Sequence, residues 1–366
     1  MSSKRRNKWI VVLMSIVLLG GSLLGLLMKD KGFSSDERRL LKQFPNMTVS
    51  SILSGKFMSE FEDYALDQFP MRESCRYLKS MVATHVFHHL DQRGIYASQG
   101  HLSKMEYPMN PQSIEKGATT FQKIYDRFLK DTDTHVYFSI IFDKNYYLAE
   151  NSSVLAMDYE AFRQQMLEKI SFMTYIDIQD KLSLDDFYKS DLHWRQEKIV
   201  DVAEKLASTM GTDVTASYEL ETLDTSFEGV YSSQSSLPHD KDQLSYLSLD
   251  EFEDCIVIDH QNNQRISVYD LEKATGRDPY EMFLSGSLSL ITIENPNANT
   301  EKELILFRDS FSSSLAPLLI PGYAKITMVD IRYIQSDLLA SWIDFDNQDV
   351  LFLYSTLVLN HGELLK

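Results

Sequence analysis

Cysteine is scarce in this sequence of 366 residues: only Cys75 and Cys255 are present, and they lie far apart. Two cysteines so far apart give no sign of a disulfide framework or of a cysteine-based zinc site, although they could pair once or stay free. Aspartates and histidines are also not clustered at the spacing of a catalytic zinc site, which normally uses three protein ligands. We therefore expect neither a metal nor a cofactor.

Basic residues are in deficit, with 36 Lys and Arg against 53 Asp and Glu, for a net charge of −17. Nucleic-acid binders carry clustered basic side chains that neutralise phosphates, so DNA and RNA are excluded as partners. The sequence also lacks internal repeats and low-complexity tracts. Its composition, 43% apolar and 24% charged, is that of a globular protein long enough for one large domain or two ordinary ones.

Charge is absent from residues 9–28, a run of 20 residues that is about long enough to cross the hydrocarbon core of a membrane. The run exceeds the usual signal-peptide core of ~7–15 residues and no A-x-A-like cleavage site follows, which favours an uncleaved anchor. Residues 1–8, MSSKRRNK, are basic and are expected to form a cytoplasmic tail. We therefore predict a single-pass protein of the cell membrane whose remaining residues are extracytoplasmic.

Residues 33–93 are expected to form a helical N-terminal segment that packs on the main domain. Apolar residues recur at helical spacing within residues 51–81, and Pro70 interrupts the pattern, so two helices should meet near it. A small β-hairpin is expected at residues 94–102.

Residues 94–366 have the pattern of an α/β domain. A strand at 134–142, a helix at 158–170 and a strand at 173–178 describe a βαβ unit and hence a parallel sheet. Residues 211–250 lack strong periodicity and are predicted to be an excursion from the sheet, for example a loop over the site. Further strands are expected at 253–259, 287–294, 304–307, 324–330 and 350–355, and further helices at 110–131, 196–210 and 336–343.

Ser310 follows one of these strands directly. The apolar run 304–307 predicts a strand buried on both faces, and Asp309 and Ser310 come where a helix would begin. Open α/β sheets bind ligands at this edge, and a helix N-terminus there would stabilise an oxyanion through free N–H groups. Lys144 comes just after the predicted strand 134–142 and is expected at the same ligand-binding edge of the sheet. The alternative for Ser310 is a helix cap and turn without chemistry.

Asp191 and His193 are separated by one residue. In an extended or turn backbone this spacing places both side chains on the same side, so the carboxylate can hold the imidazole in one tautomer. An Asp helix cap with an incidental histidine is the alternative. The adjacent Trp194 could wall a sugar-binding cleft or fill the core.

Several segments together resemble the DHHW family. YKSDLHW at 188–194 resembles the DHHW motif, and RDSFSSSLAPLL at 308–319, followed by VDIRY and DVLFLYS, resembles the C-terminal block of these proteins. DERRLLKQFP and FEDYALDQFPMR resemble the family's N-terminal opening. DHHW proteins are similar to the alginate O-acetyltransferases AlgJ and AlgX. The resemblance implies an SGNH-hydrolase-like (flavodoxin-like) α/β domain with a sheet of mostly parallel strands flanked by helices.

The resemblance also assigns residues. The Asp-x-His of the family corresponds to Asp191 and His193, its serine to Ser310, and the arginine of its strand-end motif to Arg332. Arg332 could bind an acidic sugar or position the site, and a buried structural ion pair is the alternative. A Gly-Asn-like element, expected to supply part of the oxyanion hole or substrate site, corresponds to Gly286 and Ser287.

The sequence departs from the family pattern at three positions. Leu192 stands where DHHW has its first histidine, Ser287 stands where an asparagine is usual, and Arg308 replaces the glycine of a GDS motif. The first change spares the Asp-x-His pair, while the other two affect the expected oxyanion hole.

These features predict an extracytoplasmic serine O-acetyltransferase or acetylesterase acting on cell-envelope polysaccharide or exopolysaccharide. Acetyl-CoA is absent outside the cell, so the resemblance implies a membrane-bound O-acyltransferase partner that supplies acetyl groups. A weakly active or inactive carbohydrate-binding or scaffold protein is the alternative, favoured by Leu192 and Ser287. The two differ in whether His193 lies within hydrogen-bond distance, ~2.6–3.2 Å, of both Ser310 and Asp191.

Overall fold

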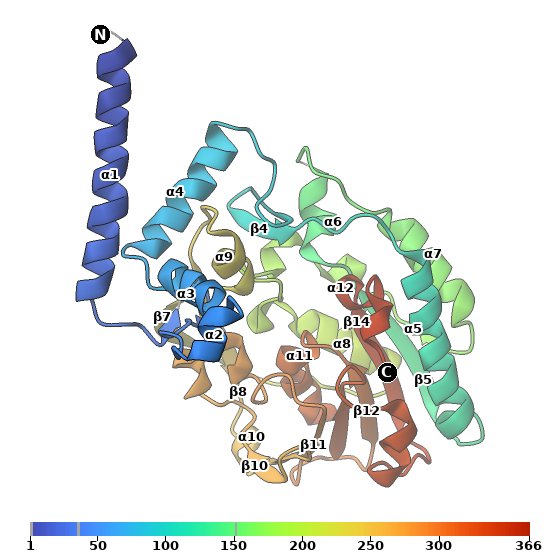
Figure 1. The fold of residues 1–366 in the computed structure, drawn as a ribbon. Helices are drawn as coiled ribbons and strands as arrows, with labels where there is room; N and C mark the ends of the chain where they lie inside the picture. Colours follow the sequence, from blue (N-terminus) through green and yellow to red (C-terminus); the bar gives the residue numbers. More distant parts are fainter. Residues whose placement is uncertain (1–2, 35–36, 151) are drawn as a thin grey trace. The chain divides into compact units, whose positions relative to one another are not determined.

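The computed structural model describes residues 1–366 except 1–2, 35–36 and 151. The chain divides into two compact units, drawn in Figure 1. The first comprises Met1–Gln92 with Ser233–Leu237, and the second comprises Arg93–Ser232 with Pro238–Lys366.

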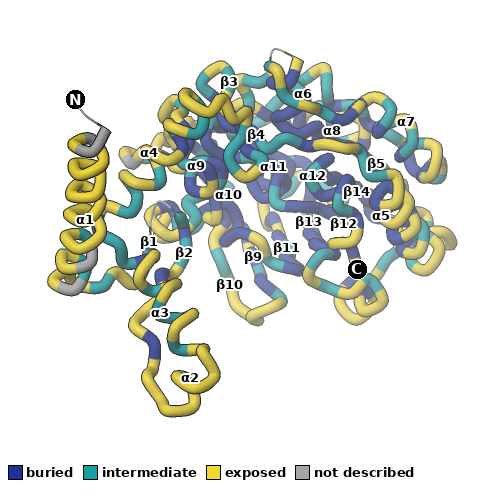
Figure 2. The backbone as a smooth tube through the Cα atoms, turned by 45° about the horizontal axis from the view of Figure 1, so that its top comes forward, coloured by how far each residue is buried: buried dark blue, intermediate teal, exposed yellow. Residues whose placement is uncertain are grey.

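The first unit begins with the long helix α1 (Ser3–Leu27). Its segment Asn7–Gly25 is long and apolar enough to cross a membrane, and Figure 2 shows it exposed along almost its whole length. An apolar helix at this place is consistent with a single anchor and also with a signal sequence.

The rest of the first unit contains short helices and one short pair of strands, and ion pairs link its segments. Helices α3 and α4 meet around Pro70. The guanidinium of Arg39 donates to both carboxylate oxygens of Asp67, at 2.5 and 2.8 Å, and this bond lowers the pKa of Asp67. The elements are β1 (Phe33–Ser34), β2 (Arg39–Leu40), α2 (Val49–Leu53), α3 (Lys56–Asp67) and α4 (Arg72–His85).

The second unit is built on an eight-stranded sheet with the order β10-β9-β11-β13-β12-β14-β5-β6. Neighbouring strands from β13 to β6 are parallel, whereas β10, β9 and β11 form an antiparallel edge that ends on β13. The predicted α/β class with mostly parallel strands is confirmed. The strands are β5 (His135–Ile141), β6 (Thr174–Tyr175), β9 (Ile256–Asp259), β10 (Gln264–Ile266), β11 (Leu290–Glu294), β12 (Glu303–Arg308), β13 (Lys325–Val329) and β14 (Asp349–Ser355).

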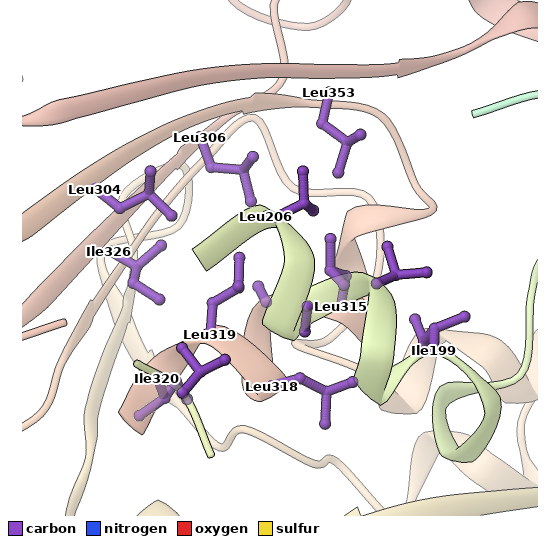
Figure 3. Close-up of a cluster of buried hydrophobic side chains, with 14 of the residues drawn as sticks. Ile199, Leu206, Leu304, Leu306, Leu315, Leu318, Leu319, Ile320, Ile326 and Leu353 are labelled. Atoms are coloured by element: carbon purple, nitrogen blue, oxygen red, sulfur yellow. The ribbon is translucent and has the colours of Figure 1, made fainter. Parts of the chain in front are cut away.

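Helices cover both faces of this sheet because its central strands are apolar on both sides. On β12, Leu304 and Leu306 belong to one core, whereas Ile305 and Phe307 belong to the other. Figure 3 shows the first core, where strand side chains meet those of α8 (Val200–Thr209) and α11 (Ser312–Leu319). The second core is formed with α5 (Pro111–Ile124) and α7 (Tyr159–Lys169).

Smaller elements surround the layers. The predicted hairpin is present as β3 (Ile95–Ser98) and β4 (His101–Lys104). The predicted helix at 336–343 is a 3-10 helix, Ser336–Ser341. The remaining helices are α6 (Lys144–Ala149), α9 (Val230–Ser235), α10 (Glu251–Asp254) and α12 (Thr356–Leu359).

The prediction of a loop over residues 211–250 is wrong in part. This stretch contains an antiparallel pair, β7 (Glu219–Phe227) and β8 (Asp242–Ser248). Strand β7 is largely exposed and polar, and its register shifts between Thr222 and Ser226, so no alternating apolar pattern marks it in the sequence.

Candidate active site

Ser310 lies at the carboxyl end of β12, two residues before α11 begins. The carboxylate of Asp309 fixes this turn: it accepts the N–H of Phe311 at 3.1 Å and the N–H of Ser355, at the end of the neighbouring strand β14, at 2.7 Å. Ser310 is partly exposed, whereas Asp309 is fully buried. The turn therefore presents the Ser310 hydroxyl at the edge of the sheet.

The Asp191–His193 segment is held in a tight turn. Phe187 forms an isolated bridge with Trp194 across it. One oxygen of the Asp191 carboxylate accepts both the backbone N–H of His193, at 3.0 Å, and its ring Nδ1, at 2.7 Å. The other oxygen accepts the N–H of Val230 at 2.8 Å. Local spacing thus orients the imidazole, and a distant segment fixes the carboxylate.

The His193 ring joins this turn to Ser310, with Nε2 at 2.8 Å from Oγ. Because a carboxylate only accepts hydrogen bonds, the proton between His193 and Asp191 resides on Nδ1, which leaves Nε2 free to accept the Ser310 proton. Asp191 and His193 are 1% and 7% exposed, so the bond between them is buried. The arrangement has the geometry of a nucleophile, a general base and an orienting carboxylate.

Lys144 was expected at the ligand-binding edge of the sheet, and the structure places its side chain in the interior. It is 1% exposed, and its Nζ donates to the carbonyl oxygens of Tyr188, Lys189 and Asp191 at 2.7, 3.3 and 2.6 Å. Three acceptors require the ammonium form. Burial lowers the pKa of Lys144 to about 7, against the opposing attraction of the Asp191 and Asp242 carboxylates. Lys144 instead ties down the turn that carries Asp191.

Trp194 belongs to the core and not to a sugar-binding wall, because its indole is 0% exposed. Its Nε1 donates to the carbonyl of Phe311 at 2.9 Å and to Ser314 Oγ at 3.0 Å. The indole therefore connects the turn of the histidine with the first turn of α11.

Arg332 forms a partly buried ion pair with Asp330, close to one of the two roles expected for it. Its Nε and Nη2 donate to the two carboxylate oxygens of Asp330 at 2.9 and 2.6 Å, and its side chain is 15% exposed. These guanidinium atoms face the Asp330 carboxylate, so Arg332 and Asp330 satisfy each other.

The expected oxyanion hole is less complete than the hydrogen-bond chain. Within the described ranges, no hydrogen bond joins Gly286 or Ser287 to the Asp191–His193–Ser310 cluster. The N–H of Gly286 donates to the carbonyl of Phe283 at 3.1 Å, and Ser287 is exposed. The backbone N–H of Ser310 makes no hydrogen bond to any described residue, so it remains available beside the Ser310 hydroxyl.

Gly229 was not predicted and is required by close packing. A Cβ atom at this position would lie 2.4 Å from the Cβ and 2.5 Å from the Cα of Asp191, closer than any real contact. Only glycine lets the segment before α9 approach the carboxylate that it holds. Residue 229 carries no local sequence signal, because the contact joins segments far apart in the chain.

No protein-family model and no curated protein matches the sequence. Among solved structures, a DHHW family protein from Eubacterium siraeum DSM 15702 matches with a TM-score of 0.55 and 18% identity, covering 74% of this chain and 93% of its own. Bacillus cereus PatB1 with a sulfonyl adduct matches with a TM-score of 0.60 and 17% identity, covering 72% and 95%.

This chain has the fold of the DHHW family protein and of PatB1. The predicted structural likeness to that family is therefore confirmed. The O-acetyltransferase domain of Pseudomonas putida AlgJ also matches, at a TM-score of 0.45 and 10% identity, covering 73% of this chain and 92% of that domain.

Proposed function

We propose that this protein is a serine O-acetyltransferase or acetylesterase of SGNH type, with Ser310 as nucleophile, His193 as general base and Asp191 as the orienting carboxylate. One observation carries the proposal: a continuous hydrogen-bond chain of 2.8 and 2.7 Å from Ser310 Oγ through the imidazole to Asp191. A core-filling serine or an isolated Asp cap would not need this chain.

In the first half of the reaction, Ser310 Oγ attacks the carbonyl carbon of an acetyl ester. Its proton passes to His193 Nε2, the carbonyl electron pair moves onto oxygen, and Asp191 stabilises the resulting imidazolium. The N–H of Ser310 stabilises the oxyanion. As the tetrahedral intermediate collapses, the bond to the leaving oxygen breaks and that oxygen takes the proton from Nε2.

In the second half, an acceptor hydroxyl attacks the acetyl-enzyme while His193 removes its proton, and Ser310 recovers a proton as it leaves. A sugar hydroxyl as acceptor gives a transferase, and water gives an esterase. Which acceptor prevails depends on how well the site excludes water. We propose a cell-envelope polysaccharide or exopolysaccharide as the acceptor.

The N-terminal helix fits this role as an uncleaved membrane anchor. Its apolar segment Asn7–Gly25 follows basic residues, which favour the cytoplasmic side. The remainder would then act outside the cytoplasmic membrane, where acetyl groups must be delivered across the bilayer. A membrane-bound O-acyltransferase partner would supply them.

The test is release of p-nitrophenol from p-nitrophenyl acetate by the full chain in detergent. We expect Ser310→Ala, His193→Ala and Asp191→Ala each to lose activity by about three orders of magnitude or more. Ser312→Ala, a neighbouring serine outside the hydrogen-bond chain, is the matched control and should remain active. A folded wild type without activity, even with an oligosaccharide acceptor present, would favour the scaffold alternative.

A further inference from the structure

Tyr280 lies flat against the imidazole of His193. The two ring centroids are 3.8 Å apart and the ring planes differ by 5°. Tyr280 belongs to the 3-10 helix Pro279–Met282, which starts where the Asp278 side chain accepts the N–H of Tyr280 at 3.2 Å. The ring is 4% exposed. The imidazole of His193 therefore packs against a fixed aromatic ring on one face.

The hydroxyl of Tyr280 contacts α11, the helix that begins two residues after Ser310. It lies 2.8 Å from Ser314 Oγ, which also accepts from Trp194 Nε1 at 3.0 Å. Ser314 stands one turn after Ser310. Ser314 in α11 thus binds both Tyr280, whose ring stacks on His193, and Trp194, which follows His193 in the chain.

We propose that Tyr280 is a positioning residue for the reaction, which holds the plane of the His193 ring and stabilises its protonated form. This inference rests on the function proposed above. The hydrogen bonds at Nδ1 and Nε2 and the link to Cβ set the mean plane of the ring. Contact with Tyr280 over a whole face limits excursions of the imidazole out of that plane.

The same contact favours the charged intermediate. When Ser310 Oγ bonds to the acyl carbon, its proton moves to Nε2 and the imidazole becomes a cation. This cation lies over the face of Tyr280, and cation–π attraction is larger in a desolvated site than in an exposed one. Burial raises the pKa of Tyr280, with its bond to Ser314 acting in the opposite direction, so the phenol stays neutral and does not compete as a base. Its role is exerted through His193.

The experiment compares wild type, Tyr280→Phe and Tyr280→Leu, all as full chains in detergent. Phenylmethylsulfonyl fluoride reports the reactivity of Ser310 without an acyl acceptor, and p-nitrophenyl acetate reports kcat and KM. We expect Tyr280→Phe, which keeps the ring, to stay within about threefold of wild type, and Tyr280→Leu to lose about 10- to 30-fold in sulfonylation rate and kcat with little change in KM. Tyr323→Leu, at a buried tyrosine outside the site, is the control for loss of packing.

Proton NMR supplies a readout that a purely structural role would not move. In the wild type, ring-current effects of Tyr280 should shift the carbon-bound ring protons of His193 upfield, and the proton between Nδ1 and Asp191 should resonate far downfield. Tyr280→Phe should keep both signals, and Tyr280→Leu should shift or broaden them. The wild-type spectrum tests the stacking even if the leucine variant does not fold.

The outcomes separate the two levels of inference. A wild type that neither hydrolyses the ester nor reacts with the sulfonyl fluoride would contradict the proposed function. An active wild type whose Tyr280→Leu variant is folded and equally reactive, or whose His193 protons show no upfield shift, would overturn the positioning role alone.

Discussion

Two buried polar groupings of the second unit differ in one respect that matters for chemistry. In the Asp191–His193 pair and in the Asp330–Arg332 pair, a buried carboxylate accepts bonds from a basic side chain at 2.6 to 2.9 Å. His193 has a second nitrogen that can accept a proton, and it lies 2.8 Å from the hydroxyl of Ser310. Arginine has only donors and stays protonated, so the second pair cannot serve as a base. A buried charge pair becomes a catalytic candidate only when its outer atom can exchange a proton.

The largest effect is expected from Asp191→Asn. An amide N–H₂ group that faces Nδ1 would favour the tautomer with its proton on Nε2, which cannot accept the Ser310 proton, and this lowers kcat by about three to four orders of magnitude. The assay is p-nitrophenyl acetate hydrolysis. The matched change in the other pair, Asp330→Asn, should leave kcat within about threefold of wild type. Equal losses in both variants would contradict the distinction between the pairs.

The second-largest effect on kcat is expected from Gly229→Ala. The new Cβ would collide with the backbone and Cβ of Asp191 and displace the carboxylate, so we expect kcat to fall about 100-fold, since misplacement by ~1 Å costs this much. Gly117→Ala is the control, because its nearest neighbour would lie at an ordinary 3.6 Å and alanine favours the helix. Unchanged kcat in folded Gly229→Ala would show that the position of Asp191 is not limiting.

Lys144→Met should lower kcat about tenfold, because the carbonyls of Tyr188, Lys189 and Asp191 lose a charged donor and the Asp191 turn loosens. The pH dependence follows from the same bonds. As pH rises through about 7, the ammonium loses a proton and can no longer donate to three oxygens, so wild-type kcat should decline on the alkaline side. The methionine variant should lack this decline. An alkaline decline of the same size in both would assign it to another group.

The smallest effect on activity is expected from Arg332→Met. Removal of the guanidinium takes two charged donors from the buried carboxylate of Asp330, which should cost about 3 kcal/mol in the free energy of unfolding, measured by urea denaturation. At a temperature where the variant is folded, kcat should stay within about threefold of wild type. A selective rise in KM for an acidic oligosaccharide would instead revive a substrate-binding role for Arg332.

The sequence carried enough information for the frame of the fold. Continuous apolar runs predicted β5, β12, β13 and β14, because strands of a covered parallel sheet are buried on both faces. The spacing of Asp191 and His193 and the place of Ser310 after its strand were readable for the same reason: they depend on local backbone geometry. Strand β7 was missed because a polar, exposed strand lacks that pattern.

Tertiary structure alone decided how the site is supported. Lys144 occupies the same kind of position after a strand as Ser310, and nothing local indicates that it turns inward to three carbonyls. The approach of Gly229 to Asp191 and the stacking of Tyr280 on His193 join segments far apart in sequence. Local patterns set which residues stand at the edge of the sheet. Packing between distant segments set which of them stay accessible and which hold the others in place, because burial and contact distance are properties of the assembled core.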